Sequence, residues 1–466
     1  MPKFNLPRIM LAAPASGCGK TTVTCALLQW MIRRGMSVSA FKCGPDYIDP
    51  MFHSQIIGAQ CRNLDLFFTG EDTVRYLFQR NCAGNEIAVI EGVMGYYDGI
   101  GVSTQASSYA LAKALQTPVI LVINARGMAL SAAAQIKGYV EFRGDSQIKG
   151  VIINNISQTV FSELKEQITK ETGIEVLGYV PKMADCALQS RHLGLVTAQE
   201  VKDLKEKLDC LADQLEKTVD IPRLLEIART AQEISYSEPF APQTIEEPPV
   251  NIGVAKDRAF CFYYEDNLQL LRDLGARIIT FSPLEDPKIP QDLDGLLLGG
   301  GYPELYACQL SENQGMLSSI KSAIESGMPT IAECGGFMYL HRCLQTSDGA
   351  VYPMADVIKE NSYPKEKLGR FGYITLTAQK DNLLCNKGEQ LAAHEFHYWD
   401  STDPGHSFTA QKPQREICWD CAYTTDYFYG GYPHLYFYSN PDTARCFLKK
   451  AREYQLKNRE MRKQNG

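Results

Sequence analysis

The chain has 466 residues and a formal net charge of −7, a length that predicts two or three domains of about 100–200 residues each. The acidic balance argues against non-specific nucleic-acid binding, which needs a basic face, and no apolar run approaches the roughly 20 residues of a membrane span. The N-terminal apolar run enters a glycine-rich loop and is therefore expected to be a core strand rather than a signal peptide, while fifteen scattered cysteines fit the reduced thiols of a cytoplasmic protein.

The first half of the chain alternates short β-rich runs with helical patterns. The predicted strands are residues 8–12, 38–42, 87–91, 119–124, 149–154 and 176–180, and helices such as 19–34 and 103–115 lie between them. This alternation predicts a doubly wound α/β domain with a mostly parallel sheet. We place that domain at residues 1–236.

A second α/β domain, residues 250–466, follows a proline-rich stretch. Residues 237–249 carry four prolines without periodicity, which is typical of a stiffened linker. Strands are then expected at 250–255, 277–281, 295–298 and 330–332. The basic amphipathic helix at 442–463 is interpreted as a packed terminal helix in preference to a binding tail.

The segment PASGCGKTT, residues 14–22, lies where the first strand meets the first helix and is typical of a phosphate-binding loop. Its backbone N–H groups would face phosphate oxygens, its lysine would reach the outer phosphates and its first threonine would hold Mg²⁺. The predicted phosphate ligands are Gly17, Gly19, Lys20, Thr21 and Thr22. Pro14 replaces the glycine of the strict pattern, and Ala15 stands where partition-type ATPases have an extra lysine, which weakens that alternative.

Two pairs of carboxylates follow the next two strands. Asp46 and Asp49 lie in KCGPDYIDPMFH, and Glu91 and Asp98 lie in EGVMGYYDG. Open parallel sheets bind ligands at the carboxyl ends of their strands, so we predict that Asp46 and Glu91 join Thr21 at Mg²⁺ and that Asp49 and Asp98 serve substrate activation. The alternative is that these are solvated loop carboxylates.

Cys334 follows the apolar strand PTIA and precedes two glycines, which predicts a nucleophile elbow. A helix N-terminus at this turn would lower the pKa of the thiol and supply N–H groups for an oxyanion. Glutamine-dependent amide synthesis needs both a phosphate loop and a cysteine nucleophile on one chain, so we predict Gly300, Gly301 and Gly335 as oxyanion and glutamine-binding positions. The alternatives are a buried structural cysteine and a simple glycine turn.

A thiolate nucleophile needs a base, and the residues leave His394, His397 and His434 as candidates. If HEFHY is a strand, His394 and His397 point to opposite faces, and a structural role for both stays open. The single CxxC, Cys418 to Cys421, has no second cysteine pair, so a zinc site there is disfavoured.

Nine segments together resemble the cobyrinate a,c-diamide synthase family, over essentially the whole chain. They are PASGCGKTT (14–22), KCGPDYIDPMFH (42–53), RNLDLFF (62–68), EGVMGYYDG (91–99), SRHLGLVTAQE (190–200), AFCFYYEDN (259–267), LLLGGGYPEL (296–305), AECGGFMYL (332–340) and HEFHY (394–398). The resemblance implies a P-loop domain followed by a class I glutamine amidotransferase-like domain. It also implies that glutamine and MgATP drive the amidation of two acetate side chains on a corrin ring.

The resemblance also implies roles for single residues. His434, in GYPHLYF, matches the base, and Tyr436 stands where related glutaminases have glutamate, so a Cys–His dyad is implied. Asn154 matches a position that reads adenine, although a strand-end turn former is an equal alternative. The implied partners are a corrinoid or related tetrapyrrole, glutamine and ATP, with neither nucleic acid nor membrane. Rival functions are a synthase for hydrogenobyrinate or nickel sirohydrochlorin, the less similar cobyric acid synthases, and a non-catalytic nucleotide switch.

Overall fold

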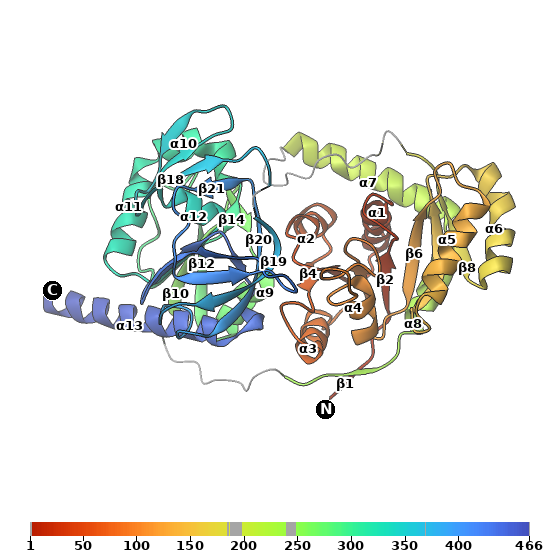
Figure 1. Ribbon diagram of the computed structural model, residues 1–466, viewed down its shortest axis with the longest axis horizontal. Coiled ribbons are helices and arrows are strands. Elements are labelled where there is room, and N and C mark those ends of the chain that lie inside the picture. The colour runs from red at the N-terminus through yellow and green to blue at the C-terminus, as the bar shows by residue number, and fades with distance from the viewer. Residues whose placement is uncertain (1, 184–185, 187–197, 239–247, 369, 466) are drawn as a thin grey trace. The chain divides into compact units, whose positions relative to one another are not determined.

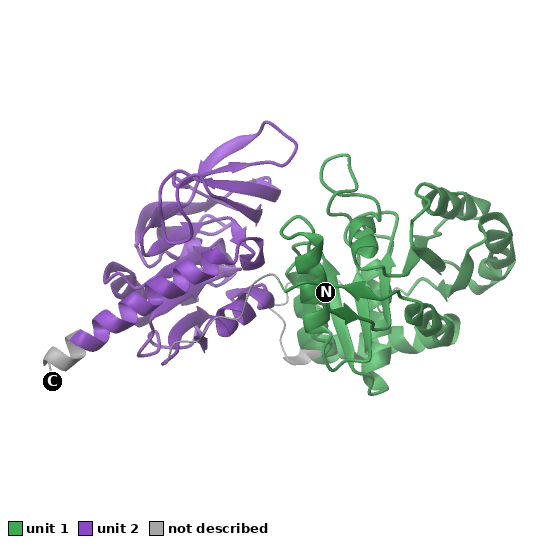
Figure 2. Ribbon diagram, turned by 90° about the horizontal axis from the view of Figure 1, so that it is seen from below, with its two compact units in different colours: residues 1–241 green, residues 242–466 purple. Residues whose placement is uncertain are grey.

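The computed structural model describes residues 2–183, 186, 198–238, 248–368 and 370–465. The chain divides into two compact units, Met1–Ala241 and Pro242–Gly466 (Figure 2). The division falls inside the predicted linker, most of which lies outside the described residues, as does most of the segment 190–200. No described helix combines the length and the apolar character that crossing a membrane would require.

Unit 1 is built on a seven-stranded sheet in which every neighbouring pair is parallel. Its strand order is β4 (Cys61–Leu64), β3 (Val38–Cys43), β5 (Ile87–Glu91), β2 (Arg8–Ala12), β6 (Val119–Asn124), β7 (Ile148–Asn154) and β8 (Glu175–Val180). The order reverses direction around β2, so the chain is doubly wound as predicted. The loop after β2 therefore opens at the point where such sheets bind ligands.

Helices cover both faces of this sheet. They are α1 (Lys20–Arg33), α2 (Ile48–Phe52), α3 (Glu71–Asn81), α4 (Ser108–Ala114), α5 (Leu130–Glu141), α6 (Gln158–Thr172), α7 (Ala198–Thr218) and α8 (Ile221–Arg229). On one face Ile9 and Leu11 join a core with α1, α7 and α8, and Figure 1 shows α7 running alongside α1. On the other face the ring of Phe41 packs against the ring of Phe78 in α3, with 5.1 Å between the ring centroids. Two buried faces are what an all-parallel sheet requires.

Strand β4 and the start of helix α4 differ from the sequence prediction for this unit, and so do the two-residue strands β1 (Lys3–Phe4) and β9 (Ile234–Ser235), which were not predicted. Strand β4 was not predicted, because two of its four residues, Arg62 and Asn63, are polar and no alternation is visible over so short a run. Helix α4 begins five residues later than predicted, at Ser108, because the side chain of Ser107 accepts a hydrogen bond from the N–H of Ala110 and caps the helix there.

Unit 2 contains a six-stranded sheet that is parallel except at one edge. The order is β12 (Ala276–Phe281), β10 (Val250–Ala255), β13 (Gly295–Leu298), β15 (Thr330–Glu333), β25 (Phe428–Gly431) and β24 (Tyr423–Thr425), with only β24 antiparallel to its neighbour. The helices are α9 (Glu265–Asp273), α10 (Ala307–Glu312), α11 (Gln314–Glu325), α12 (Gly335–Tyr339) and α13 (Asp442–Asn465). The four strands predicted here are all present.

The rest of unit 2 is β-rich. A five-stranded sheet has the order β23 (Cys418–Cys421), β22 (Phe408–Gln411), β19 (Arg370–Ala378), β20 (Gln390–His397) and β26 (His434–Leu435). A four-stranded sheet has the order β17 (Val351–Pro353), β16 (His341–Gln345), β18 (Ile358–Pro364) and β21 (Trp399–Ser401). Helix α13 is packed, since Phe447 is buried and Gln455 donates to Asp294 at 2.7 Å.

Candidate active site

The phosphate loop spans the seven residues between β2 and α1, and both of its glycines have left-handed backbones. Gly17 has φ 81° and Gly19 has φ 94°, a region that other residues rarely adopt. A Cβ on Gly19 would also lie 2.0 Å from the side-chain nitrogen of Asn154. These two positions therefore require glycine, and the first turn of α1, with Lys20, Thr21 and Thr22, begins directly after them.

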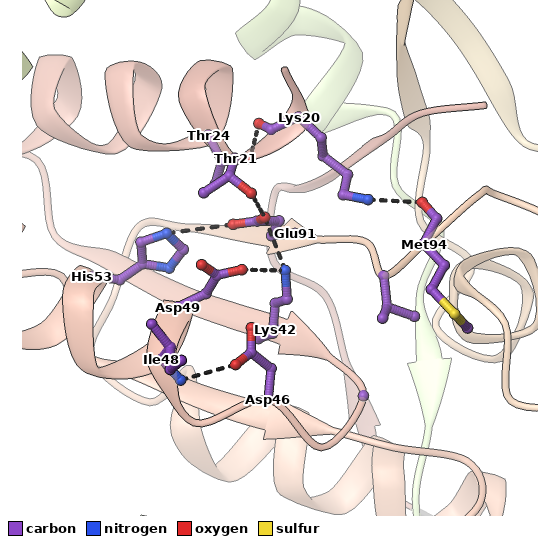
Figure 3. A network of polar contacts seen from close by, with 12 residues as sticks. Lys20, Thr21, Thr24, Lys42, Asp46, Ile48, Asp49, His53, Glu91 and Met94 are labelled. Atoms are coloured by element: carbon purple, nitrogen blue, oxygen red, sulfur yellow. Dashed lines mark hydrogen bonds and ion pairs between the residues drawn. The ribbon is translucent and has the colours of Figure 1, made fainter. Parts of the chain in front are cut away.

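Thr21 and Glu91 meet at the start of α1. The Thr21 hydroxyl donates to Glu91 Oε1 at 2.5 Å, and the Lys20 ammonium donates to the Met94 carbonyl at 2.8 Å (Figure 3). Burial, and after it the charge of Lys42, lowers the pKa of Lys20 to about 8. The structure thus brings together the loop lysine, the predicted metal-binding threonine and the carboxylate that ends β5.

A second lysine lies among the predicted acidic residues. Lys42, near the end of β3, donates to Asp49 Oδ2 at 2.6 Å and to Glu91 Oε1 at 2.9 Å, and it is only 4% exposed. Burial by itself would lower the pKa of Lys42, but the charges of Glu91, Asp49 and Asp46 raise it above the ordinary value. Burial and the neighbouring Asp49 raise the pKa of Asp46. These carboxylates form a buried charged cluster, and the solvated-loop alternative does not hold for Asp49 and Glu91.

The remaining predicted residues of this unit, Asn154 and Asp98, lie beside the phosphate loop. Asn154 ends β7 and donates to the carbonyl of Cys18 in the phosphate loop at 2.9 Å, which gives it a loop-positioning contact, and its predicted role in reading adenine stays a prediction. Asp98 is exposed in the loop after β5. Burial, and after it the charge of Asp98, raises the pKa of Tyr139. Tyr139 in turn donates to the carbonyl of Pro14.

The residues present fit a magnesium ion held jointly with a nucleotide. Mg²⁺ usually takes one or two carboxylates and completes its shell with phosphate oxygens and water. Glu91 Oε2 is buried and has no hydrogen-bond partner among the described residues, with His53 Nε2 at 3.4 Å. Within the same residues no three His, Cys, Asp or Glu side chains form a ready-made metal cage. Thr21 and Glu91 are thus suitable ligands once phosphate is present. Asp46 Oδ1 accepts the N–H of Ile48 at 2.9 Å, and its predicted role at the metal stays a prediction.

In unit 2, Cys334 occupies the sharp turn between β15 and α12. Its backbone has φ 46° and ψ −102°, a strained conformation for a residue with a side chain. Gly336, two residues on, is sterically required, because a Cβ there would lie 2.1 Å from the Leu298 carbonyl oxygen. The geometry is that of a nucleophile elbow.

The thiol of Cys334 differs from the sequence prediction in one respect. Burial, and then the charge of Glu304, raises its pKa above the ordinary value, although the N–H of Gly335 acts in the opposite direction. The expected lowering by the helix end is overridden because desolvation of a buried thiolate outweighs one N–H group. Burial also raises the pKa of Glu304 to about 7. A raised pKa favours the protonated thiol, so a nucleophilic role of Cys334 would require a base.

The predicted oxyanion glycines gather beside the elbow. Gly300 and Gly301 form the short strand β14, paired with β11 (Phe260–Phe262). A Cβ on Gly335 would lie 3.0 Å from the backbone nitrogen of Gly301, and one on Gly300 would lie 2.6 Å from Cε1 of His434. The loop of Gly300 and Gly301, the turn of Cys334 and the imidazole of His434 thus meet at one place.

His434 is buried on β26, and a carboxylate faces it. Glu333 Oε2 lies 3.6 Å from His434 Nδ1, and Glu333 Oε1 accepts the N–H of Leu435 at 3.1 Å. His394 is the register partner of His434, and burial, followed by the charge of His434, lowers the pKa of His394 to about 3. The imidazole of His397 instead stacks on the ring of Tyr432, with 4.0 Å between the ring centroids. His434 is the only one of the three that the contacts place against both Gly300 and a carboxylate.

Sequence reasoning gave no role to Lys42 or Glu333. Each is a charged residue at the carboxyl end of an otherwise buried strand, VSAFKC for Lys42 and TIAE for Glu333. A charge in such a run is itself a signal, because buried charges are rare unless they are paired. The partners could not be read from the sequence, since they come from distant segments.

Two family models cover most of the chain. The model of the CobQ/CobB/MinD/ParA nucleotide binding domain matches residues 9–196, and that of the CobB/CobQ-like glutamine amidotransferase domain matches residues 251–442. The first contains the phosphate loop and its carboxylates. The second contains Cys334 and His434.

Three proteins named cobyrinate a,c-diamide synthase are similar to this chain over nearly its full length. The protein of Caldanaerobacter subterraneus subsp. tengcongensis is 37% identical over 448 residues, 96% of this chain and 98% of that protein. The Listeria innocua protein is 40% identical, covering 93% and 97%, and the Clostridium acetobutylicum protein is 39% identical, covering 95% and 99%. With its nucleotide-binding and glutamine amidotransferase domains, the chain is an amide ligase that belongs to the cobyrinate a,c-diamide synthase family.

Proposed function

We propose that the protein amidates the a and c acetate carboxylates of cobyrinate, with glutamine as nitrogen donor and ATP as the activating reagent. The observation that carries the proposal is that one chain holds two complete sets of groups. One set is the phosphate loop with Lys20, Thr21 and Glu91, and the other is the strained Cys334 beside His434. The names of its relatives supply the substrate class.

The glutaminase chemistry belongs to unit 2. His434 takes the thiol proton, and the sulfur of Cys334 attacks the side-chain amide carbon of glutamine while backbone N–H groups near Gly301 and Gly335 stabilise the oxyanion. Ammonia leaves with that proton, and water then hydrolyses the thioester to glutamate and restores the thiol. No metal ion is needed for these steps.

The activation chemistry belongs to unit 1. A carboxylate oxygen of the substrate attacks the γ-phosphorus of ATP, ADP leaves, and an acyl phosphate remains. Ammonia attacks its carbonyl carbon, and phosphate leaves as the amide forms. Lys20 stabilises charge on the phosphates, and Mg²⁺ held by Thr21, Glu91 and Asp46 would neutralise them further. Asp49 and Asp98 are the proposed residues for positioning the substrate carboxylate.

The substrate assignment is tested by offering the purified protein cobyrinate, hydrogenobyrinate or nickel sirohydrochlorin with glutamine and MgATP. We expect tetrapyrrole-dependent ADP formation and a mass spectrum of the diamide to be strongest with cobyrinate. Preference for either other ring would reassign the substrate within the same chemistry. Absence of both ADP and glutamate with all three would favour the non-catalytic switch, against which Lys20, Glu91 and Cys334 argue.

A further inference from the structure

The ammonium group of Lys42 lies where a cation is expected to bind. It reaches Asp49 Oδ2 at 2.6 Å and Glu91 Oε1 at 2.9 Å, and Thr21 donates to the same Glu91 oxygen at 2.5 Å (Figure 3). One carboxylate oxygen is therefore shared between the hydroxyl proposed to bind Mg²⁺ and a lysine. A buried ammonium is stable only with such close partners.

The position of Lys42 is fixed by the sheet rather than by a loose loop. Lys42 and Glu91 are register partners on the adjacent parallel strands β3 and β5, and Asp49 comes to them from α2. The backbone ladder already holds the two strands together from Val38 and Ile87 onward, so the ion pair is not needed to join them. Balancing the negative charge of Asp49 and Glu91 explains the location of Lys42 better than a role in strand pairing does.

Counting charges shows what a free metal ion would meet. Asp46, Asp49 and Glu91 can carry three negative charges, and Lys20 and Lys42 carry two positive ones. A divalent ion arriving alone would enter beside both ammonium groups and leave the cluster net positive. A divalent ion arriving with the phosphates of ATP would bring its own counter-charge and give the ammonium a new anionic partner.

We propose that Lys42 is a resident counter-ion of the metal site. In the nucleotide-free protein its ammonium holds the oxygens of Asp49 and Glu91 and disfavours a divalent ion by itself. It yields the Glu91 oxygen when the metal arrives with nucleotide phosphates. The inference rests on the proposed function, in which Glu91 is a metal ligand, and it adds that this lysine couples metal binding to nucleotide binding.

The test measures Mn²⁺ binding to the full chain by electron paramagnetic resonance, with and without a non-hydrolysable ATP analogue. The variants are Lys42→Met, which removes the charge, and Lys42→Arg, which keeps it. Without nucleotide, Lys42→Met should bind Mn²⁺ about tenfold or more tightly than the unaltered protein, because a like charge a few ångströms away dominates the local electrostatics. Lys42→Arg should resemble the unaltered protein. Lys113→Met, which loses an exposed lysine paired with Asp145, should change nothing.

Equal or weaker Mn²⁺ binding by Lys42→Met would overturn the proposal. If Lys42→Met is less stable because Asp49 and Glu91 lose the lysine, Mn²⁺ should raise the thermal midpoint of Lys42→Met more than that of the unaltered protein. A smaller or equal rise would also overturn the proposal. Glu91→Gln in the same assay separates the counter-ion role of Lys42 from the metal-ligand role of Glu91. Loss of Mn²⁺ binding in Glu91→Gln with no effect of Lys42→Met refutes only the counter-ion role. Unchanged binding in Glu91→Gln refutes the metal assignment itself.

Discussion

Glu333 reaches His434 from the strand that carries the nucleophile. Its Oε2 lies 3.6 Å from Nδ1 of His434, and its other oxygen accepts a backbone N–H next to that histidine. A carboxylate so placed can fix the ring orientation and tautomer of a histidine base. The carboxylates of nucleophile–histidine–carboxylate triads do this, in whatever order the three residues follow along the chain. The position two residues after His434 is Tyr436, so we infer that Glu333 would supply, from a different direction, the carboxylate that is missing from the sequence pattern.

We expect Glu333→Gln to lower kcat of glutamine hydrolysis by roughly tenfold or more, with little change in KM. This loss is smaller than the whole contribution of a general base, because His434 itself remains. The physical reason is that the amide no longer stabilises the imidazolium that forms at His434. Glutamate release measures the effect, and ammonia-dependent amidation is the internal control. An unchanged kcat would mean that His434 is oriented by other contacts.

The lowered pKa of Lys20, about 8, predicts a pH dependence of nucleotide binding. Only the protonated ammonium pairs with phosphate, so affinity for an ATP analogue should be nearly constant below pH 8. Above it, the affinity should fall by at most about tenfold per pH unit, the limit for loss of one proton. Titration calorimetry between pH 7 and 9.5 measures this fall. Lys20→Arg, which stays charged, should flatten the dependence, and a flat curve for the unaltered protein would contradict the prediction.

At the scale of elements, the strand, turn and helix around Cys334 hold the nucleophile in place by close backbone contact. Gly336→Ala would put a Cβ 2.1 Å from the Leu298 carbonyl. We expect a loss of about 1–3 kcal/mol of stability, the usual range for overpacking, together with reduced glutaminase activity. Thermal unfolding measures the first effect. Gly138→Ala in α5, where a Cβ would meet nothing within 4 Å, is the matched control and should not destabilise. A Gly336→Ala protein as stable as the control would contradict the elbow packing.

The elements also show what the sequence could predict. Most strands of the parallel sheets were visible because their runs are continuously apolar, as in VILVIN of β6. The parallel strand β25 was not predicted, because two of its four residues, FYGG, are glycines. Strand β4 and the late start of α4 were missed because they depend on a neighbouring strand and on the capping hydroxyl of Ser107. Cys334 and the phosphate loop were found because a local turn creates each. Lys42 with Asp49, and Glu333 with His434, required the tertiary fold.

At the scale of the whole molecule, the two chemistries are expected to be separable by mutation. Cys334→Ser should abolish glutamine-dependent synthesis and leave ammonia-dependent synthesis nearly intact, because the thiol only releases ammonia. Glu91→Gln should do the reverse, with glutamate release preserved and ADP and amide formation reduced by orders of magnitude. Glutamate, ADP and amide are assayed separately on each purified variant. If Cys334→Ser lost amide synthesis with ammonia as well as with glutamine, or if Glu91→Gln formed ADP normally, the division of the two chemistries between the units would be refuted.

The start and the end of unit 1 are joined to each other. Strand β1 (Lys3–Phe4) pairs antiparallel with β9 (Ile234–Ser235), and Arg8 donates to the carbonyl of Gln232. The polypeptide therefore leaves this unit beside the point where it entered, as in domains that tolerate circular permutation. The fold of unit 1 thus does not dictate which unit is encoded first, and a rearranged gene with the glutaminase half ahead of the synthetase half should still yield the same seven-stranded domain.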